Sequence, residues 1–551
     1  MTNDGWTSER PSEVALPWWH GAVGYCLYLR SFADGNGDGI GDLQGVIDRL
    51  DHLETLGVDI VWITPFYPSP MADFGYDVAD HCDVEPALGD LCVFDELLAA
   101  AHERGIAVVI DLVANHTSID HPWFRSARTD AQSDFRDFYL WADPSADGSP
   151  PNNWVSYFGG PAWTLDEASG QYYLHLFLPE QPDLNWRHPG VRSAFDRIMR
   201  FWLERGVDGF RVDVAQGLVK AKDFPSNPQR SAVGHLASRQ DAWAAFDHRY
   251  DILQSESLDV FAGWKRVCQE YDAILIGEVS VADPGAFAST IDGQGLDVGT
   301  WLETLHVAWD ADALRAVLRG PTDRTDHPQS IGWLGSSLDE PRAATRFGGG
   351  DLGKQRSLAL ATTMLFLPGI PFLYQGEELG LEQAVVPSDQ RADPVGEVVE
   401  SSRDGCRTPM PWSLEPGFGF TQHPTPWLPF GQHVEADTAT AQRGVAGSWF
   451  ERHRQLIQVW HDLDDVDALP VVWLRFRDGD LIGFRRGSVA VVLNASNREV
   501  EVALNGVTLY QSWGERDPAE DALGGAEVGV LPGSSAVVLR LGTRPAEFEL
   551  S

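Results

Sequence analysis

Two charged side chains share one side of a predicted strand in the segment GVDGFRVDV, residues 206–214. Arg211 and Asp213 are two residues apart, so both project from the same side of the strand, opposite to its apolar residues. A cation and a carboxylate make a poor core, because charged groups are mostly solvated. One interpretation is an ion pair on the surface of an edge strand. The other is a reactive pair at a strand end.

Two further acidic residues follow predicted strands in the same way. Glu278 is the penultimate residue of the run AILIGEV, and Asp339 directly follows the run IGWLGSSL. His116 ends the motif DLVANH after another strand, although a single histidine at such a place is more typical of a structural role. Three converging carboxylates could supply a nucleophile, a proton donor and a group that helps to distort a sugar ring, which is the chemistry of glycosidic bond cleavage.

Convergence of this kind requires parallel strands whose carboxyl ends meet at one opening. Short β-rich runs alternate along the chain with segments of helical periodicity such as 43–56 and 93–104. This alternation predicts an α/β fold, a closed (β/α)8 TIM barrel with its chemistry at the C-terminal strand ends. An open doubly wound sheet is the alternative, but no glycine-rich phosphate fingerprint follows the first run. The predicted strands are 23–32, 59–65, 107–113, 209–214, 273–279, roughly 296–304, 330–337 and 370–375.

Two regions depart from this alternation. The segment 117–186 is too long for a strand–helix connection and is rich in Pro, Trp and Tyr, which predicts a subdomain inserted after strand 3 over the barrel mouth. Near the end of the chain, short runs at 471–476, 481–485, 489–494, 499–504 and 536–541 predict a C-terminal antiparallel β-sandwich. The expected segments are therefore 1–116 (barrel, first part), 117–186 (inserted subdomain), 187–465 (barrel, second part) and 466–551 (C-terminal domain).

The segment DGNGDGIGD places oxygen-bearing groups at alternate positions. These are the side chains of Asp34, Asn36, Asp38 and Asp42, with the backbone of Ile40 between them. Alternating oxygen ligands are typical of a calcium loop. The loop is not an EF-hand, because the twelfth position of that count is Gly45 rather than Glu. A glycine-rich turn with solvated carboxylates is the structural alternative.

The charge of the chain argues against two classes of partner. Acidic residues outnumber basic ones 81 to 41, so a nucleic acid or an anionic membrane would be repelled. No apolar run reaches the roughly 18 residues that a membrane helix needs, and the N-terminal residues show no signal peptide. Five scattered cysteines without a C-x-x-C spacing argue against a disulfide framework or zinc. We expect a cytoplasmic protein that binds neither nucleic acid nor membranes; its oligomeric state is left open.

In combination these motifs resemble glycoside hydrolase family 13, the α-amylase family, and in particular its exo-acting α-glucosidase and oligo-1,6-glucosidase branch. The matching segments, spread over essentially the whole chain, are DGNGDGIGDL, DLVANHTS, QPDLNW, GFRVDV, LIGEV and RDGCRTPMPW. The resemblance implies a retaining double displacement that releases single glucosyl units from the non-reducing end of a small oligosaccharide or glucoside. It also implies a structural calcium ion and no organic cofactor.

The resemblance assigns a role to each site residue. Asp213 would be the nucleophile and Glu278 the acid/base, with their carboxyl groups about 5–5.5 Å apart and Glu278 protonated at rest. Arg211 would keep the nucleophile ionised, and Asp339 would bind the C2 and C3 hydroxyls. The pocket for the terminal sugar would contain Asp73, Tyr76, Asp111, His116 and Arg407, with Tyr76 as the stacking platform and Asp73 paired with Arg407. Calcium would be held by Asp34, Asn36, Asp38, Ile40 and Asp42.

One position departs from the family. Ser337 and Leu338 stand where members usually carry Asn-His before the third carboxylate, and Leu338 cannot donate the hydrogen bond that the imidazole gives to the C2 or C3 hydroxyl. The enzyme could act on a sugar altered at C2 or C3, it could be a slow glucosidase or a transglucosylase, or another donor could take over. Linkage preference stays open: Val214 is typical of α-1,6 activity, but DVAQGLVK resembles bacterial maltases.

Three functions therefore compete. The main hypothesis is a retaining α-glucosidase, and the related alternative is an α-glucosyl transferase, because the sequence does not distinguish water from an alcohol as acceptor. A non-catalytic carbohydrate-binding or interaction protein belongs to a different class. Relatives of that class have lost catalytic residues and gained a membrane helix, whereas Asp213, Glu278 and Asp339 are all present here.

Overall fold

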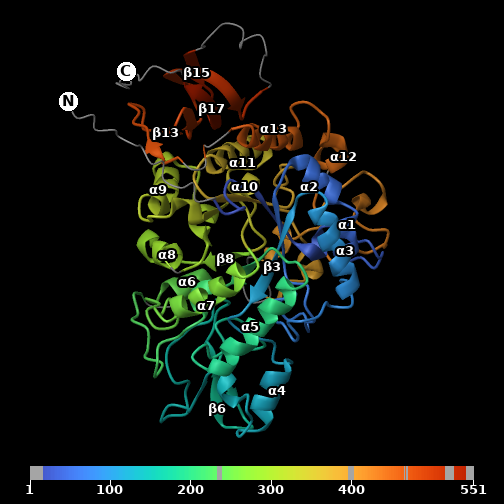
Figure 1. The fold of residues 1–551 in the computed structure, drawn as a ribbon, viewed down its shortest axis with the longest axis vertical. Helices are drawn as coiled ribbons and strands as arrows, with labels where there is room; N and C mark the ends of the chain where they lie inside the picture. Colours follow the sequence, from blue (N-terminus) through green and yellow to red (C-terminus); the bar gives the residue numbers. More distant parts are fainter. Residues whose placement is uncertain are drawn as a thin grey trace, which may run out of the picture.

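Eight parallel strands form a closed barrel in the computed structural model, which describes residues 16–231, 239–293, 295–394, 402–432, 434–463, 466, 469–514 and 527–541 (Figure 1). Their order is β1-β11-β10-β9-β8-β7-β3-β2, and Phe372 of β11 pairs with Gly24 of β1. This pairing closes the sheet, so the predicted barrel is confirmed and the open-sheet alternative is wrong. The strands are β1 Gly24–Leu27, β2 Ile60–Ile63, β3 Ala107–Val113, β7 Gly209–Asp213, β8 Ile274–Val279, β9 Val298–Trp301, β10 Ile331–Leu334 and β11 Ile370–Tyr374.

Apolar side chains fill the barrel. The sequences IVWI of β2 and IPFLY of β11 are buried throughout, as expected for parallel strands covered by helices. A Cβ atom at Gly24 would lie 2.2 Å from the ring of Phe372, so only glycine fits where β1 meets β11.

Helices surround the barrel, and several begin at an aspartate whose side chain caps the first turn, as Asp90 and Asp310 do. The helices of the barrel and its connections are α1 Leu43–Ile47, α2 Leu50–Leu56, α3 Leu91–His102, α5 Pro189–Leu203, α6 Arg239–Ala244, α7 Ser257–Gln269, α8 Pro284–Ile291, α9 Ala311–Thr322, α10 Ala343–Arg346, α11 Gly350–Leu365, α12 Ala439–Gln442 and α13 Trp449–His461.

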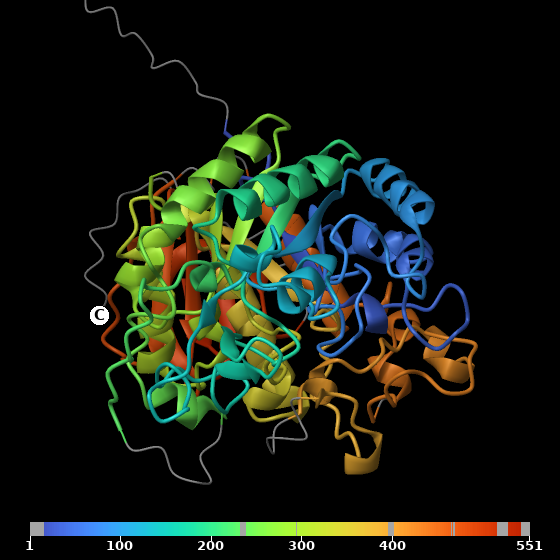
Figure 2. The same cartoon turned by 90° about the horizontal axis from the view of Figure 1, so that it is seen from below.

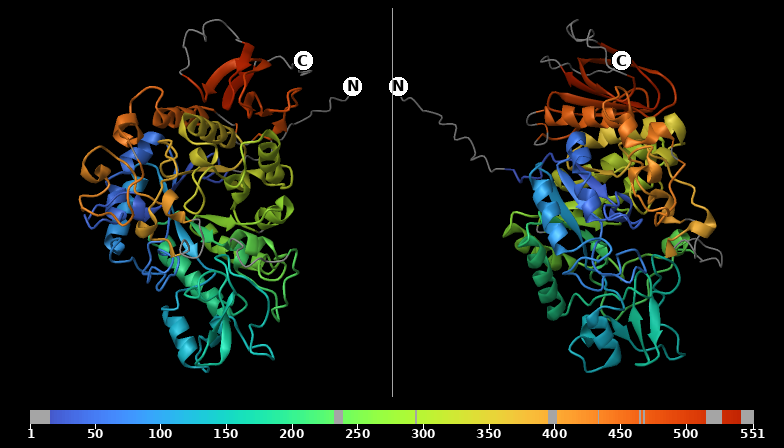
Figure 3. Two further views of the ribbon diagram at one scale, coloured as in Figure 1. Left: turned by 180° about the vertical axis from the view of Figure 1, so that it is seen from behind. Right: turned by 90° about the vertical axis from the view of Figure 1, so that its right-hand side faces the viewer.

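The connection between β3 and β7 builds a separate small layer. It contains α4 Pro122–Thr129 and an antiparallel sheet of β4 Trp141–Ala142, β6 Gln171–Leu174 and β5 Trp163–Asp166, all within the predicted insertion 117–186. This layer forms one end of the long axis in Figures 1 and 3, and Figure 2 views the molecule from that end. Its core includes Trp154 and Ile252, so it packs against the connection that follows β7.

An antiparallel β domain lies at the opposite end of the long axis (Figures 1 and 3). Its strands are β12 Val472–Trp473, β13 Leu481–Arg486, β14 Val489–Asn494, β15 Val500–Gln511, β16 Glu527–Leu531 and β17 Ser535–Leu541, in the order β12-β13-β14-β17-β15-β16. The first part of β15 pairs with β16 and its last part with β17, so β15 passes from one layer to the other. Val492 and Leu531 pack between the layers. The predicted C-terminal antiparallel domain is confirmed, with β16 as an additional strand.

Two predictions concern membranes and export. No helix among the described residues is long and apolar enough to cross a membrane. Residues 1–13, on which the signal-peptide prediction depends, lie outside the described part of the chain.

Candidate active site

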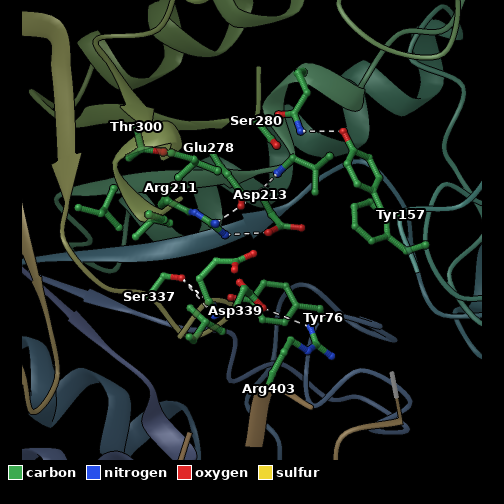
Figure 4. A pocket seen from close by; sticks show the side chains of 18 of the residues that line it. Tyr76, Tyr157, Arg211, Asp213, Glu278, Ser280, Thr300, Ser337, Asp339 and Arg403 are labelled. Atoms are coloured by element: carbon green, nitrogen blue, oxygen red, sulfur yellow. Dashed lines mark hydrogen bonds and ion pairs between the residues drawn. The ribbon is translucent and has the colours of Figure 1, made fainter. Parts of the chain in front are cut away.

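The C-terminal ends of the barrel strands surround a cavity of about 310 Å³ (Figure 4). Asp213 is the last residue of β7, Glu278 is the penultimate residue of β8, and Asp339 lies in the turn that follows β10. All three side chains line this cavity. The structure thus brings together the three carboxylates whose convergence the strand ends predict.

Arg211 connects these carboxylates. Its Nη1 donates to Oδ1 of Asp213 at 2.7 Å and to Oδ1 of Asp111 at 2.8 Å. Its Nη2 lies 3.0 Å from Oε2 of Glu278, and the ring of Trp62 covers the guanidinium at 4.6 Å. Arg211 is 4% exposed and Asp213 6%, so the interpretation of the pair as a surface salt bridge is wrong.

Three carboxyl groups therefore share one guanidinium. Burial raises the pKa of Asp213 well above its usual range; Arg211 opposes this shift and the neighbouring carboxylates reinforce it. Burial, again opposed by Arg211, raises the pKa of Asp111 to about 6. The single guanidinium of Arg211 thus opposes the effect of burial on Asp111 and Asp213 without cancelling it.

The residue after Asp213 has a strained backbone. Val214 has a φ of 48°, a left-handed conformation that a β-branched residue rarely adopts. In this conformation its N–H donates to Oε2 of Glu278 at 2.9 Å. Backbone strain of this kind persists where the surroundings require it, and here it ties the end of β7 to the carboxyl group of β8. No sequence pattern signals this bond.

One end of the cavity is polar and closed by a salt bridge. Oδ1 of Asp73 accepts a hydrogen bond from Nη2 of Arg403 at 2.7 Å, and Nη1 of Arg403 lies 3.3 Å from Oδ1 of Asp339. Arg403 and Asp73 both line the cavity, as does Tyr76, which Figure 4 shows on the same side as Arg403. The expected pairing of Asp73 with Arg407 is therefore corrected to a pairing with Arg403.

Arg407 lies behind this wall. It is fully buried, its Nη2 donates to Oδ1 of Asp339 at 2.8 Å, and its Nε donates to the backbone carbonyl of Leu338 at 2.8 Å. Residues 403–406 form a 3₁₀ turn, with three residues per turn, so side chains four positions apart point in different directions. The motif RDGCRTPMPW contains both arginines, and its sequence alone does not tell which one faces the cavity.

His116 and Tyr76 are locked together beside this end. Nε2 of His116 lies 3.1 Å from the backbone carbonyl of Tyr76, and the hydroxyl of Tyr76 donates to Oδ2 of Asp111 at 3.2 Å. Burial lowers the pKa of His116 to about 3, so its imidazole is neutral at physiological pH. Because the amide of Asn115 faces Nδ1, the single N–H of the neutral ring lies at Nε2 and donates to the Tyr76 carbonyl, so His116 holds Tyr76 in place.

A buried ion pair supports His116 from behind. Nζ of Lys220 lies 2.7 Å from Oδ2 of Asp183 and donates to Oδ1 of Asn115 at 2.8 Å. Nδ2 of Asn115 donates to Oδ1 of Asp183 at 3.0 Å and lies 3.1 Å from Nδ1 of His116. Asp183 belongs to the connection after β3 and Lys220 to the connection after β7, so the pair joins the two. This network was not predicted, because nothing in the segments QPDLNW and DVAQGLVK indicates that they meet in the fold.

Leu338 lines the cavity with an apolar side chain and is 1% exposed. The adjacent Ser337 accepts hydrogen bonds at its Oγ from the backbone N–H groups of Asp339 and Glu340, each at 3.2 Å. Ser337 therefore shapes the turn that presents Asp339. The guanidinium of Arg403 is the charged donor that lies beside Asp339 on the cavity wall.

Aromatic rings from the insertion form part of the cavity rim. Tyr157 stacks on Trp243 with ring centroids 3.7 Å apart and on Phe177 at 5.1 Å. Phe158 lies under the guanidinium of Arg403 at 5.1 Å. The insertion thus narrows the entrance, as expected of a subdomain over the barrel mouth.

The expected calcium loop has two parts. Asp34 accepts hydrogen bonds from the N–H groups of Gly37 and Gly39, and the outer turn that contains Asn36 and Asp38 is exposed. Asp42 is 2% exposed and accepts from the N–H of Gly45 at 2.7 Å, which caps α1. The described residues contain no group of three or more His, Cys, Asp or Glu side chains arranged around a metal position. A calcium ion would therefore depend on the Asn36 amide and the Ile40 carbonyl as well as on carboxylates.

Comparison with known proteins agrees with this geometry. The family model for the α-amylase catalytic domain matches residues 26–465. The chain is 40% identical to a probable α-glucosidase of Rhizobium meliloti, over 85% of this chain and 87% of that protein. It is 36% identical to the oligo-1,6-glucosidase of Parageobacillus thermoglucosidasius, over 81% and 84% of the respective chains.

A solved structure of an α-glucosyl transfer enzyme superimposes with a TM-score of 0.86 at 36% identity, covering 96% of this chain and all of the other. A (β/α)8 barrel with three carboxylates at its mouth fits the class of carbohydrate-active enzymes to which these relatives belong. The chain belongs to the α-amylase family, glycoside hydrolase family 13, and is a glycoside hydrolase.

Proposed function

We propose that this protein is a retaining α-glucosidase that releases single glucosyl units from the non-reducing end of small α-glucosides. The observation that carries the proposal is the arrangement of Asp213 and Glu278 on one guanidinium, Arg211, next to a cavity end closed by the salt bridge between Asp73 and Arg403. The names of the relatives support the same substrate class.

In the first step Asp213 attacks the anomeric carbon and forms a glycosyl ester, while Glu278 donates its proton to the oxygen of the leaving group. In the second step Glu278 takes a proton from water, and the water cleaves the ester. Arg211 stabilises the carboxylate of Asp213 through a charge-assisted hydrogen bond. The N–H of Val214 fixes the carboxyl group of Glu278, which limits the positions from which it can transfer a proton.

The closed end of the cavity holds the terminal glucosyl ring. Tyr76 is the stacking platform, and its hydroxyl is held by Asp111. Asp73 and Arg403 bind the C4 hydroxyl and leave no room for a further sugar, which makes the enzyme exo-acting. Asp339 binds the C2 and C3 hydroxyls and is itself held by Arg407.

Leu338 favours a second candidate function. Because an apolar side chain lines the cavity next to Asp339, the site also suits a sugar modified at C2 or C3, or a transfer reaction in which hydrolysis is slow. Arg403 is the donor that would compensate in an ordinary glucosidase. Replacing Leu338→His separates these cases: turnover of an ordinary α-glucoside rises severalfold if only the donor is missing, and stays equal or falls if the site is adapted to a modified sugar.

We also propose that the loop 34–42 binds calcium through Asp34, Asn36, Asp38, Asp42 and the carbonyl of Ile40. The exposed outer turn gives access, and hard oxygen donors suit this ion. The ion would have a structural role, so chelation is expected to lower the melting temperature without a matched loss of activity at 25 °C. Differential scanning fluorimetry with EGTA, and then with added Ca²⁺, tests this.

The deciding experiment for the main proposal is hydrolysis of p-nitrophenyl α-glucopyranoside by the wild type, Asp213→Asn and Asp208→Asn. Asp208 directly precedes β7, at the end remote from Asp213, and its carboxylate accepts a hydrogen bond from the N–H of Val108, so it is a control outside the cavity. Activity lost in Asp213→Asn and kept in Asp208→Asn supports the proposal. Equal activity of wild type and Asp213→Asn would contradict it.

A further inference from the structure

The cavity has two chemically different ends. Figure 4 shows Tyr76 and Arg403 on one side of Asp213, whereas Ser280 and Thr300 lie with Glu278 on the other side. In the proposed function the first end holds the glucosyl ring. Glu278 protonates the oxygen that joins this ring to the leaving group, so the leaving group must extend into the second end.

The second end, here called the leaving-group end, is formed by residues that follow three neighbouring strands. Val214 and Gln216 follow β7, Ser280 follows β8, and the 3₁₀ turn Leu302–Leu305 with His306 follows β9. Of the apolar members, Val214 and Leu305 are almost fully buried and Leu302 is partly exposed. The polar members are the amide of Gln216, the hydroxyl of Ser280 and the imidazole of His306.

The leaving-group end lacks a permanent cation among the described residues that line it. The two arginines of the cavity, Arg211 and Arg403, are each held by more than one carboxylate outside this end. His306 faces a carboxylate, with its Nδ1 3.9 Å from Oε2 of Glu340, and burial lowers the pKa of the imidazole. Glu340 interacts electrostatically with Arg346, whose Nη2 donates to the backbone carbonyls of Thr304 and Gly335 and which does not line the cavity. An anionic leaving group would therefore meet the carboxylate of Glu340 and no cation on the cavity wall of this end.

We propose that the leaving-group end selects neutral alcohols with an apolar face, alkyl or aryl, both as the leaving group in hydrolysis and as the acceptor in transfer. This inference rests on the proposed function, because it requires cleavage between Asp213 and Glu278. Apolar contact with Val214, Leu302 and Leu305 supplies the preference, and the lack of a cation excludes phosphorylated leaving groups.

The test compares kcat/KM for methyl and hexyl α-D-glucopyranoside. The two leaving alcohols have similar basicity, so the difference reports contact with the five additional carbons rather than the chemical step. Burying each methylene group is worth up to about a fourfold gain, and we expect a ratio of hexyl to methyl of at least tenfold. Leu302→Asn should lower this ratio several-fold. Leu352→Asn, an exposed leucine on α11, is the matched control and should keep the wild-type ratio.

The outcomes separate the two proposals. Cleavage of both glucosides with a ratio near one, or of neither while p-nitrophenyl α-glucopyranoside is cleaved, overturns this inference and leaves the α-glucosidase proposal intact. Cleavage of none of the three overturns both. The hexyl-to-methyl ratio of kcat/KM in the wild type tests the inference by itself, even if Leu302→Asn fails to fold. As a second arm, trehalose 6-phosphate should be cleaved at least tenfold more slowly than trehalose; equal or faster cleavage would contradict the exclusion of phosphorylated leaving groups.

Discussion

Two groups of buried charges meet at the cavity, and their charge balance differs. In the Arg211 cluster, one guanidinium serves Asp111, Asp213 and Glu278. In the Arg403 cluster, two guanidiniums, Arg403 and Arg407, serve Asp73, Asp339 and Asp393.

The titration of the two clusters reflects this difference. Burial raises the pKa of Asp111 to about 6 despite its bond to Arg211. Asp393 is also largely buried, but its hydrogen bonds and charge interaction with Arg403 outweigh burial and lower its pKa to about 2. Asp111, which shares one guanidinium with two other carboxyl groups, thus has a raised pKa, whereas Asp393, in the cluster with two guanidiniums, has a lowered one. The Arg211 cluster is therefore suited to catalysis, and the Arg403 cluster is suited to positioning the substrate.

Removing the only cation of the Arg211 cluster should have the largest effect. We expect Arg211→Met to lower kcat/KM for p-nitrophenyl α-glucopyranoside by about 10³-fold or more. Without the guanidinium the ionised form of Asp213 is less stable, its pKa rises further, and the acidic limb of the pH profile moves to higher pH. A pH–rate profile with an unmoved acidic limb would contradict this role for Arg211.

The Arg403 cluster should respond to substitution in a different way. We expect Arg403→Met to lower kcat/KM by about 10²-fold, with an increase in KM and no shift of the acidic limb. Arg407→Met should have a smaller effect on kcat/KM, because Arg407 acts through Asp339 and the Leu338 carbonyl. A shifted acidic limb in Arg403→Met would remove the distinction between the two clusters.

The buried pair of Lys220 and Asp183 offers a test of positioning outside both clusters. Lys220→Met leaves Asp183 charged and unpaired, which should lower the free energy of unfolding by about 3–5 kcal/mol. The double variant Lys220→Met/Asp183→Asn should recover part of this loss, because the uncompensated charge is gone. Urea unfolding measures both, and KM for the glucoside reports whether His116 has moved. No recovery in the double variant would contradict a charge-based role.

Lowering the pH should destabilise the protein, because the inserted subdomain contains a buried histidine, His121, that is neutral in the folded state. Burial, reinforced by the charge of His81, lowers the pKa of His121 to about 3, below its ordinary value of 6.5. The contribution of neutral His121 to stability is present above pH 6.5 and is lost as pH falls towards 3, because the unfolded chain binds the proton first. His121→Asn keeps a helix cap for α4. At pH 5 it should reduce the slope of unfolding free energy against pH by about 1 kcal/mol per unit; an unchanged slope would contradict this.

The strands and the three carboxylates were predictable because each signal is local. An apolar run that ends in Asp or Glu, as at Asp213 and Glu278, identifies a strand and its reactive end within a few residues. The bond from Arg403 to Asp73 joins residues 330 positions apart, and its choice over Arg407 depends on the direction of a 3₁₀ turn. The positive φ of Val214 also lacks a sequence signal, since no glycine marks it. Such features depend on tertiary packing and became visible only in the folded chain.

The Lys220–Asp183–Asn115 network has a mechanical consequence. It fastens the wall that covers the sugar site to the barrel at the point where His116 is held. Moving that wall away from the barrel would break a buried ion pair, which has a high free-energy cost. We therefore expect this wall of the pocket to keep one position while a ligand binds and leaves.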